Sequence, residues 1–183
     1  MKVYTKEGDS GTSSVLGSKK RIPKSSQIFD LLGLCDEINA TLGCALVDLK
    51  RGPVTSLIEA IQEELFQIGA YIAGLKPTSQ DKKVWAEKVR QMESKIDKYS
   101  LKLPIVKSFI LPGGTRSASQ IHLARVKVRT LERELVSFVN RGNKMSLRFL
   151  LPYINRLSDL LFIIARYANK IGGKEERLWR HKK

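Results

Sequence analysis

Histidine and cysteine are scarce in this chain of 183 residues, which contains two of each. Two histidines without a Cys-x-x-Cys pair do not supply the ligands of a zinc site, so we expect no metal bound by the protein itself. Cys35 and Cys44 lie nine residues apart on one expected helix, a separation too large for a disulfide. We therefore expect two free thiols in the core, as in proteins of the reducing cytoplasm.

Long apolar runs and a phosphate-binding glycine loop are also missing. The longest apolar stretches, such as residues 160–165, fall far short of the ~20 residues that span a bilayer, and the N-terminus has no apolar signal core. The Walker spacing Gly-x-x-x-x-Gly-Lys-Ser/Thr does not occur. We therefore expect a cytoplasmic location, no membrane partner and, for any nucleotide, a site of another design.

Positive charge dominates what is present. The formal net charge is +15 and the pI is near 10.0, so the chain should attract polyanions such as nucleic acid or ATP. However, the basic residues are spread along the chain, without the zinc spacing or interleaved aromatics of nucleic-acid-binding modules. We therefore expect no nucleic-acid partner.

Apolar residues recur at spacings of three and four in five segments, the pattern of helices that each bury one stripe. Glycine and proline separate several of these segments, as at Gly52-Pro53, and no strand-like alternation is evident. The stripes lie within residues 31–49, 54–72, 85–99, 121–138 and 147–168. The sequence predicts an all-α single domain with a polar arm (1–25), an antiparallel-leaning five-helix bundle (26–172) and a basic tail (173–183).

The arm has a composition suited to phosphate. Residues 4–14 read Tyr-Thr-Lys-Glu-Gly-Asp-Ser-Gly-Thr-Ser-Ser, and a second basic group follows at 19–24. Gly8 and Gly11 allow a positive φ and close approach of the backbone, while Lys6 and the hydroxyl groups can donate to phosphate oxygens. The same composition is typical of a flexible polar arm, so both interpretations stay open.

The fourth and fifth helices carry a second set of candidates. Arg125, Arg129, Glu132 and Arg133 share one face of the fourth helix. Arginine forks bind phosphate bidentately, but a solvated face with salt bridges has the same spacing. Asn155 lies within an apolar stretch of the fifth helix, where it either bonds to a neighbouring helix or lines a nucleotide pocket.

Two further candidates lie elsewhere. Asp36 flanks the first apolar stripe, where a carboxylate needs a cation or water, and Arg125 is a plausible partner. Phe109 begins the segment Phe-Ile-Leu-Pro-Gly-Gly-Thr between the third and fourth helices. From the residues alone, a place for Phe109 in the core is favoured over one in a ligand cavity.

Five motifs, in order and along almost the whole chain, resemble those of the PduO-type ATP:cob(I)alamin adenosyltransferases. They are Tyr-Thr-Lys-x-Gly-Asp-x-Gly (4–11), Asp-Glu-Ile-Asn (36–39), Phe-Ile-Leu-Pro-Gly-Gly (109–114), His-Leu-Ala-Arg through Glu-Arg (122–133) and Asn-Arg-Leu-Ser-Asp-Leu-Leu-Phe (155–162). The resemblance implies a ferritin-like five-helix bundle that forms a homotrimer, with ATP and a corrinoid at the subunit interfaces. The implied reaction transfers the 5′-deoxyadenosyl group of ATP to Co(I), giving adenosylcobalamin and triphosphate.

The resemblance also implies roles for individual residues. Phe109 matches the aromatic residue that displaces the lower axial ligand of cobalt, and Asp36 and Arg125 match a pair that bridges two subunits. Mg²⁺ would be held mostly by ATP and water, and the implied protein partners are a reductase and an adenosylcobalamin-dependent enzyme. The implied catalytic set is Phe109, Asp36, Arg125 and Arg129. The implied nucleotide-binding set is Thr5, Lys6, Glu7, Gly8, Ser13, Ser14, Lys24, Arg129, Glu132, Arg133 and Asn155.

Some positions depart from the family pattern. Thr130 stands where many members have a second consecutive arginine, Ser10 replaces a common lysine, and Leu32 lies where an aromatic is often found. Two other functions stay open: a non-catalytic carrier of corrinoid or ATP, and a basic bundle that binds nucleic acid. Turnover with triphosphate release distinguishes an enzyme from a carrier. Salt-dependent binding to DNA or RNA would identify a nucleic-acid-binding bundle.

Overall fold

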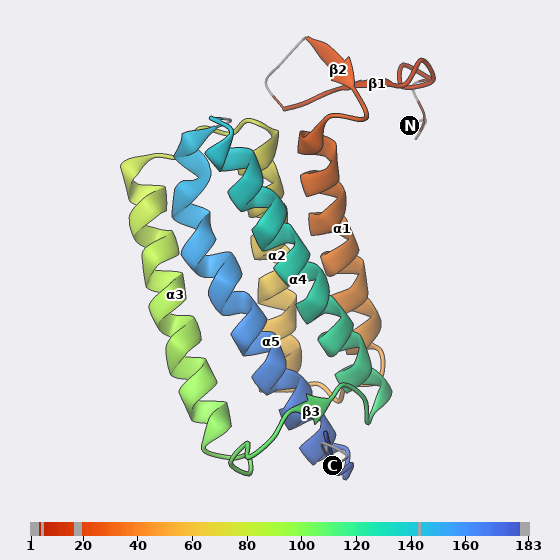
Figure 1. The fold of residues 1–183 in the computed structure, drawn as a ribbon, viewed down its shortest axis with the longest axis vertical. Helices are drawn as coiled ribbons and strands as arrows, with labels where there is room; N and C mark the ends of the chain where they lie inside the picture. The colour runs from red at the N-terminus through yellow and green to blue at the C-terminus, as the bar shows by residue number, and fades with distance from the viewer. Residues whose placement is uncertain (1–3, 5, 17–19, 143, 180–183) are drawn as a thin grey trace.

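The computed structural model describes residues 4, 6–16, 20–142 and 144–179. Within these residues five α-helices run side by side, and a short 3₁₀ helix, η1 (Met145–Leu150), precedes the last of them (Figure 1). This architecture confirms the predicted all-α five-helix bundle. The helices are α1 (Gln27–Leu46), α2 (Pro53–Ala73), α3 (Ser79–Ser100), α4 (Arg116–Asn140) and α5 (Leu151–Ile171).

The helix ends follow local sequence signals. Pro53 occupies the first turn of α2, where its missing N–H costs nothing, and Gly74 ends that helix with a φ of 140°. Thr78 caps α3 and exchanges hydrogen bonds with Asp81 in a capping box. Thr115 caps α4 by accepting from the N–H of Ala118 at 3.1 Å.

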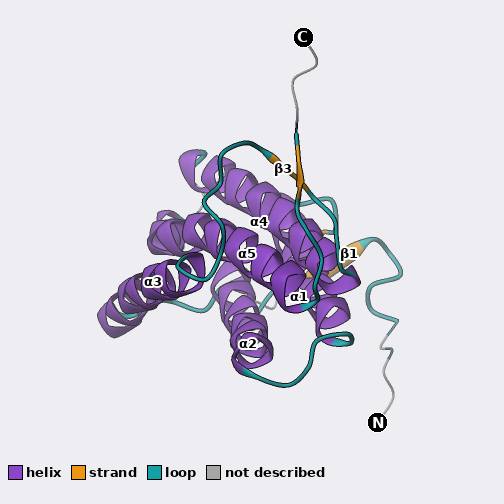
Figure 2. Ribbon diagram, turned by 90° about the horizontal axis from the view of Figure 1, so that it is seen from below, coloured by secondary structure: helices purple, strands orange, loops and turns teal. Residues whose placement is uncertain are grey.

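The core lies where α5 packs between α3 and α4, and α4 in turn contacts α1 (Figure 2). The predicted apolar stripes of α2 and α4 are buried along their whole length, as are the positions predicted for the fifth helix, the first two of which lie in η1. The third stripe is buried less completely, because Val89 and Ile96 are only partly covered.

An aromatic cluster fixes α3, the most polar of the helices, against the bundle. The Trp85 ring is 2% exposed and meets the rings of Tyr71, Phe149 and Tyr153 edge-on, with centroids 6.3, 6.4 and 4.7 Å away. Edge-to-face contacts of this kind stabilise beyond the area that they bury. Trp85 therefore contributes much of the attachment of α3.

Two short antiparallel strand pairs depart from the prediction that strands are absent. β1 (Thr12–Ser14) pairs with β2 (Arg21–Pro23), and β3 (Ile110–Leu111) pairs with β4 (Arg177–Leu178). Runs of two or three residues are too short to display alternation. The β1–β2 pair lies beyond the start of α1, whereas β3 lies at the opposite end of the bundle (Figure 1).

The two thiols have different surroundings. Both are free, but Cys35 is buried and Cys44 is exposed, so the expectation of two core thiols is wrong for Cys44. Nine helical steps of 100° turn a side chain to the opposite face, which accounts for the difference. Burial raises the pKa of the Cys35 thiol to about 12, and Asp36 adds to this effect.

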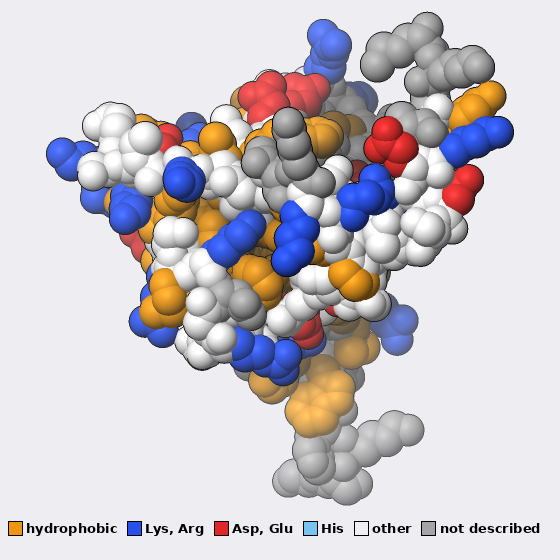
Figure 3. All heavy atoms as spheres, turned by 90° about the horizontal axis from the view of Figure 1, so that it is seen from above, with side chains coloured by type: hydrophobic (Ala, Val, Ile, Leu, Met, Phe, Trp, Pro, Cys, Tyr) orange, Lys and Arg blue, Asp and Glu red, His pale blue; other side chains and the backbone are white. Residues whose placement is uncertain are grey.

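The surface agrees with the dispersed charge of the sequence. Seen from the end that carries the arm, Lys and Arg side chains are distributed around the molecule, with apolar and acidic side chains between them (Figure 3). None of the described helices combines the length and apolar character that crossing a membrane requires.

Trp85→Ala should lower the free energy of unfolding by about 3–5 kcal/mol, because it leaves a cavity beneath α3. Urea unfolding followed by circular dichroism measures the effect. Val84→Ala, at the neighbouring position that is 42% exposed, is the matched control and should change the stability by less than about 0.5 kcal/mol. Equal effects of the two substitutions would contradict the anchoring role of Trp85.

Candidate functional site

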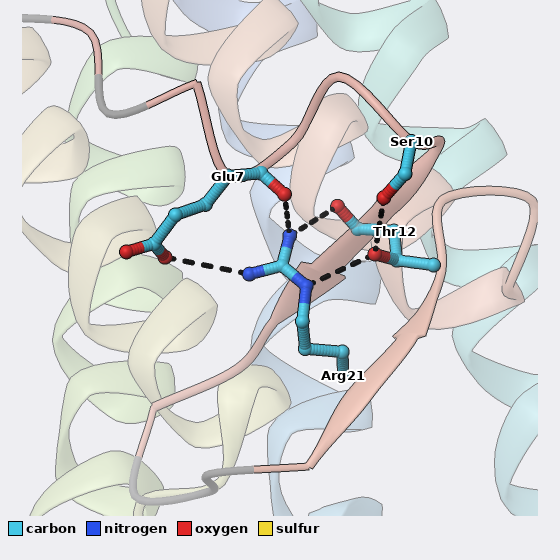
Figure 4. Close-up of polar contacts among 4 residues, drawn as sticks. All are labelled: Glu7, Ser10, Thr12 and Arg21. Carbon is cyan, nitrogen blue, oxygen red and sulfur yellow. Dashed lines mark hydrogen bonds and ion pairs between the residues drawn. The ribbon is translucent and has the colours of Figure 1, made fainter.

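Arg21 on β2 organises the N-terminal arm (Figure 4). Its Nε donates to the Thr12 hydroxyl at 3.0 Å, and one terminal nitrogen donates to the Thr12 carbonyl at 2.8 Å and to the Glu7 carbonyl. The other terminal nitrogen lies 3.4 Å from the Glu7 carboxylate. The described part of the arm is therefore a folded loop. Arg21 was not among the predicted site residues; the only signal in the sequence was its place in the basic group 19–24.

The folded loop brings several predicted phosphate ligands together. The Lys24 ammonium lies beside Gly8, where an added Cβ would be only 3.1 Å from Nζ, and the Lys24 N–H donates to the Gly11 carbonyl at 2.9 Å. Lys6 and Gly11 adopt positive φ values of 61° and 76°. The Asp9 N–H donates to the Lys6 carbonyl at 3.3 Å and the Gly11 N–H to the Gly8 carbonyl at 3.1 Å, so consecutive turns fold this loop on itself.

The remaining arm candidates lie close by. Ser13 and Ser14 are in β1, opposite Ile22 and Arg21 of β2. Thr5 lies outside the described residues. The structure thus places Lys6, Gly8, Lys24 and the two serines on one small loop and hairpin at one end of the bundle.

A second group surrounds a cavity of about 430 Å³ between α4 and α5, lined in part by Arg125, Arg129 and Arg156. Arg156 is neutralised, because it lies 2.7 Å from Asp159 and 3.2 Å from Glu93. Arg125 and Arg129, in contrast, have no carboxylate partner among the described residues, and the buried Nε of Arg125 has no hydrogen-bond partner there. This cavity therefore carries uncompensated positive charge.

The Asn155 side chain links α5 to α4. Its Nδ2 donates to Glu132 Oε1 at 2.7 Å, so the predicted cross-helix bond is present and two nucleotide-binding candidates lie in contact. Arg133 is exposed, and its recorded partner is the Thr130 hydroxyl at 3.4 Å. Thr130 itself bonds back to the Val126 carbonyl at 3.4 Å, so it adds no positive charge to this face.

Asp36 does not meet Arg125 within the chain. It lines a separate cavity of about 410 Å³ between α1 and α2, together with Asn39 and Phe66 among others, and the two cavities share no lining residue. In the part of the chain that the structure describes, Asp36 forms no ion pair. The two side chains are therefore not paired within one chain, and their pairing across two subunits stays a prediction.

Phe109 is 79% exposed, so the expectation of a core position is wrong. Its carbonyl accepts from the Trp179 N–H at 2.7 Å, and the two rings meet edge-on with centroids 6.4 Å apart. The side chain is therefore available to a ligand at the end of the bundle opposite the arm.

His122 is a buried polar residue that was counted in the sequence but given no role. It is 3% exposed, and neither ring nitrogen has a hydrogen-bond partner among the described residues. Burial, and then the charge of Arg125, lower its pKa to about 4 although Glu176 acts in the opposite direction. His122 is therefore neutral at physiological pH. The His-x-x-Arg spacing, which places it one turn from Arg125, was the signal for its position.

The arm, the arginines of α4 and Phe109 lie at different positions along the length of the bundle. α4 has 25 residues, so at 1.5 Å per residue the bundle is about 37 Å long. The arm lies at one end of the bundle and β3, which directly follows Phe109, lies at the other (Figure 1). Arg125 and Arg129 lie in the middle turns of α4, between the two ends. Within one chain these groups are therefore spread over the length of the bundle.

Acid should destabilise the protein through His122. Its folded pKa of about 4 lies below the unfolded value of 6.5, so the unfolded state binds the proton first and stability falls from about pH 6.5 towards pH 4. At about 1.4 kcal/mol per pKa unit, this loss is up to about 3 kcal/mol. Urea unfolding measures the free energy of unfolding at each pH relative to its value at pH 8. Between pH 7 and pH 4 this free energy should fall less for His122→Phe than for the wild type. Parallel pH profiles for the two proteins would contradict this assignment.

Comparison with known proteins finds adenosyltransferases that match nearly the whole chain. The family model for cobalamin adenosyltransferase matches residues 3–168. The chain is 37% identical to the corrinoid adenosyltransferase of Bacillus subtilis over 177 residues, covering 94% of this chain and 89% of that protein. It is 34% identical to the corrinoid adenosyltransferase MMAB of Homo sapiens over 187 residues, covering 97% of this chain and 73% of that protein.

A solved structure shows the same fold. It is that of a variant PduO-type ATP:corrinoid adenosyltransferase from Lactobacillus reuteri complexed with cobalamin and ATP. It is 32% identical to this chain, with a TM-score of 0.85, and the match covers 98% of this chain and all of that one. With a family match over nearly the whole length and this structural likeness, the chain belongs to the cobalamin adenosyltransferase family.

Proposed function

We propose that this protein is an ATP:corrinoid adenosyltransferase, which transfers the 5′-deoxyadenosyl group of ATP to the Co(I) of a corrinoid and releases triphosphate. The observation that carries the proposal is the cavity between α4 and α5. There Arg125 and Arg129 lack a carboxylate partner among the described residues, although Arg156 beside them is paired. Uncompensated guanidinium groups on a concave surface suit a polyphosphate.

In this reaction the corrinoid substrate supplies the nucleophile. The electron pair of Co(I) forms a bond to the ribose C5′, the C5′–O bond breaks, and triphosphate leaves with the bonding electrons. The protein therefore needs no nucleophilic Ser, Cys or His of its own. Its tasks are to place C5′ against cobalt and to stabilise the charge on the departing triphosphate.

Residues of the arm and of α4 together stabilise the charge on the departing triphosphate. Lys6, Gly8 and Lys24, together with Thr5, Glu7, Ser13 and Ser14, form the phosphate-binding loop, and Arg129 and Arg133 add charge from α4. The described residues contain no group of three or more His, Cys, Asp or Glu side chains that could hold a metal. Mg²⁺ would enter with ATP, held mostly by phosphate oxygens and water, and would leave with triphosphate.

Asn155 and Glu132 bind the nucleoside. Because their mutual hydrogen bond uses one N–H of Asn155 and one oxygen of Glu132, the amide carbonyl and the second carboxylate oxygen remain as acceptors. These acceptors suit the hydroxyl and amino donors of adenosine. The pair thus orients the sugar while the arginines hold the phosphates.

The active site is completed between subunits of a homotrimer. Asp36 and Arg125 line different cavities of one chain, and neither has an ion-pair partner among the described residues. Packing the α1–α2 face of one subunit on the α4–α5 face of the next would pair them. Phe66, which is 71% exposed beside Asp36, would be covered in the same contact.

Phe109 acts on the corrinoid. An exposed aromatic side chain at the end of the bundle can occupy the lower face of cobalt and displace its axial ligand. Four-coordinate Co(II) is easier to reduce, so a cytoplasmic reductase can then deliver the electron that forms Co(I). The adenosylated product would pass to an enzyme that depends on it.

Anaerobic mixing of the purified protein with cob(I)alamin, ATP and Mg²⁺ tests the activity. Loss of the Co(I) absorbance, with formation of a light-sensitive product and stoichiometric triphosphate over many turnovers, is the expected result. Binding of ATP and corrinoid without turnover would identify a carrier instead.

Arg129→Ala should lower kcat/KM by an amount equivalent to about 2–4 kcal/mol, since it removes a cation that stabilises the leaving triphosphate. Steady-state kinetics with varied ATP measures the loss. Arg90→Ala is the matched control: Arg90 is an exposed arginine on α3, paired with Glu87, and its loss should leave the kinetics unchanged. Unchanged kinetics for Arg129→Ala would remove this residue from the site.

Mixing two inactive variants tests the shared site. Asp36→Ala and Arg125→Ala should each be nearly inactive, but subunits exchanged between them should recover activity in about a quarter of the interfaces, where an intact Asp36 meets an intact Arg125. Activity is measured before and after exchange at equal concentrations, and each variant exchanged with itself is the control. No recovery in mixtures shown to contain both chains would contradict the interface.

A further inference from the structure

Residues 176–179, at the end of the described chain, lie along the loop that carries Phe109 between α3 and α4. We call these four residues the strap. β4 pairs with β3, so that Leu178 lies opposite Ile110. Beyond the ladder, the Trp179 N–H donates to the Phe109 carbonyl at 2.7 Å and the Ser108 hydroxyl donates to the Trp179 carbonyl at 2.8 Å, across 71 positions of sequence. The strap therefore holds the residues on both sides of Phe109: Ser108 by its hydrogen bond to Trp179, and Ile110 by its pairing with Leu178.

The loop has few other attachments near Phe109. The side chains of Ile105, Val106 and Phe109 are 85%, 44% and 79% exposed, so burial contributes little to its position. The recorded ring contact of Phe109 is the edge-on contact with Trp179. Seen from below, β3 lies beside the ends of the helices and not among them (Figure 2).

The two ends of the connection between α3 and α4 are held by α5. Asn169, which is 2% exposed, donates to the Gly113 carbonyl and accepts from the Thr115 N–H, both at 2.8 Å. At the other end, a terminal nitrogen of Arg166 donates to the Pro104 carbonyl at 2.8 Å. Between these anchors, the stretch that carries Phe109 depends on the strap.

A buried ion pair holds the strap. Arg166 is 4% exposed; its Nε donates to one oxygen of Glu176 at 2.7 Å and a terminal nitrogen donates to the other at 2.9 Å. The Glu176 side chain is itself 15% exposed. Removing one partner of such a pair leaves the other buried and uncompensated, so the pair cannot be opened without cost. Because Arg166 also contacts Pro104, one side chain on α5 joins the strap to the loop.

We propose that Arg166 and Glu176 are positioning residues for Phe109: through the strap, their ion pair fixes the loop that places the Phe109 ring against cobalt. This inference rests on the proposed function of Phe109. Loss of the pair frees the strap and lets the ring move, whereas the arginines on α4 and the arm keep their places. The step that needs the ring is therefore impaired, and transfer to cobalt that is already reduced is not.

The test compares Glu176→Ala and Glu176→Gln with Phe109→Ala, and uses Glu175→Ala, at the exposed neighbouring position, as the matched control. Each protein is assayed by two routes: from cob(II)alamin with a reductant, and from cob(I)alamin prepared chemically. We expect Glu176→Ala to slow the first route by about tenfold and the second by less than about twofold. Glu176→Gln keeps the size and one hydrogen bond, so it should lie between Glu176→Ala and the wild type.

Two further readouts separate positioning from general damage. The spectrum of bound cob(II)alamin reports the fraction that has lost its lower ligand, and this fraction should fall in Glu176→Ala. With cobinamide, which has no lower nucleotide ligand to displace, the defect should shrink to within about twofold of the wild type. Thermal unfolding shows whether each variant is folded at the assay temperature, and if Glu176→Ala is not, Glu176→Gln carries the same test.

The outcomes distinguish the two proposals. Equal loss by both routes, or a normal fraction of four-coordinate cobalt in the Glu176 variants, would overturn the positioning role while Phe109→Ala stays selectively impaired. If Phe109→Ala shows no selective loss of activity from cob(II)alamin, the proposed role of Phe109 is wrong. The positioning role of Arg166 and Glu176 is then wrong as well, because it rests on that role. Selective loss in Phe109→Ala and Glu176→Ala, but not in Glu175→Ala, supports both.

Discussion

Burial of α5 between α3 and α4 determines how the polar side chains at the end of this helix are satisfied. Polar side chains enclosed in this way must be hydrogen-bonded, because an unmet donor or a lone charge is costly away from water. Arg166 and Asn169 meet this requirement by reaching out of the bundle to the connection between α3 and α4 and to Glu176. The same bonds that satisfy the core thereby set the position of the loop that carries Phe109.

Charge is distributed by a similar logic. Several arginines are paired, such as Arg21 with Glu7 and Arg156 with Asp159, and these pairs hold the arm and α5 in shape. Arg125 and Arg129 lack carboxylate partners in the described chain, although a charge excess of +15 favours any anion that can neutralise them. In the proposed reaction the departing triphosphate is such an anion, and these two arginines would stabilise it.

Helical periodicity predicted the bundle and its core because each buried stripe repeats over several turns, and one repeat supports the next. It failed where a position depends on contacts from distant parts of the chain. The strand pairs are too short to leave a pattern, and the residues alone favoured a core position for Phe109, whose side chain is exposed on a loop that pairs with β4. The role of Arg21 in folding the arm depends on Glu7 and Thr12 in three dimensions, which composition does not reveal.

Among the site residues, those on one helix face were predictable and those on different faces were not. Arg125 and Arg129 share a face by spacing alone, and both line the cavity between α4 and α5. The predicted pairing of Asp36 with Arg125 across two subunits came from the resemblance and not from helix geometry, because the two residues line different cavities of one chain. In the proposed trimer a second chain would supply the partner that each of these side chains lacks within its own described chain.

A structure of the assembled protein with ATP and a corrinoid bound tests whether the active site is shared between subunits. We expect three subunits, with the Asp36 carboxylate of each within hydrogen-bond distance of the Arg125 guanidinium of the next, and with the corrinoid between Phe109 and the nucleotide. A nucleotide and corrinoid enclosed by a single chain, with Asp36 in solvent, would contradict it.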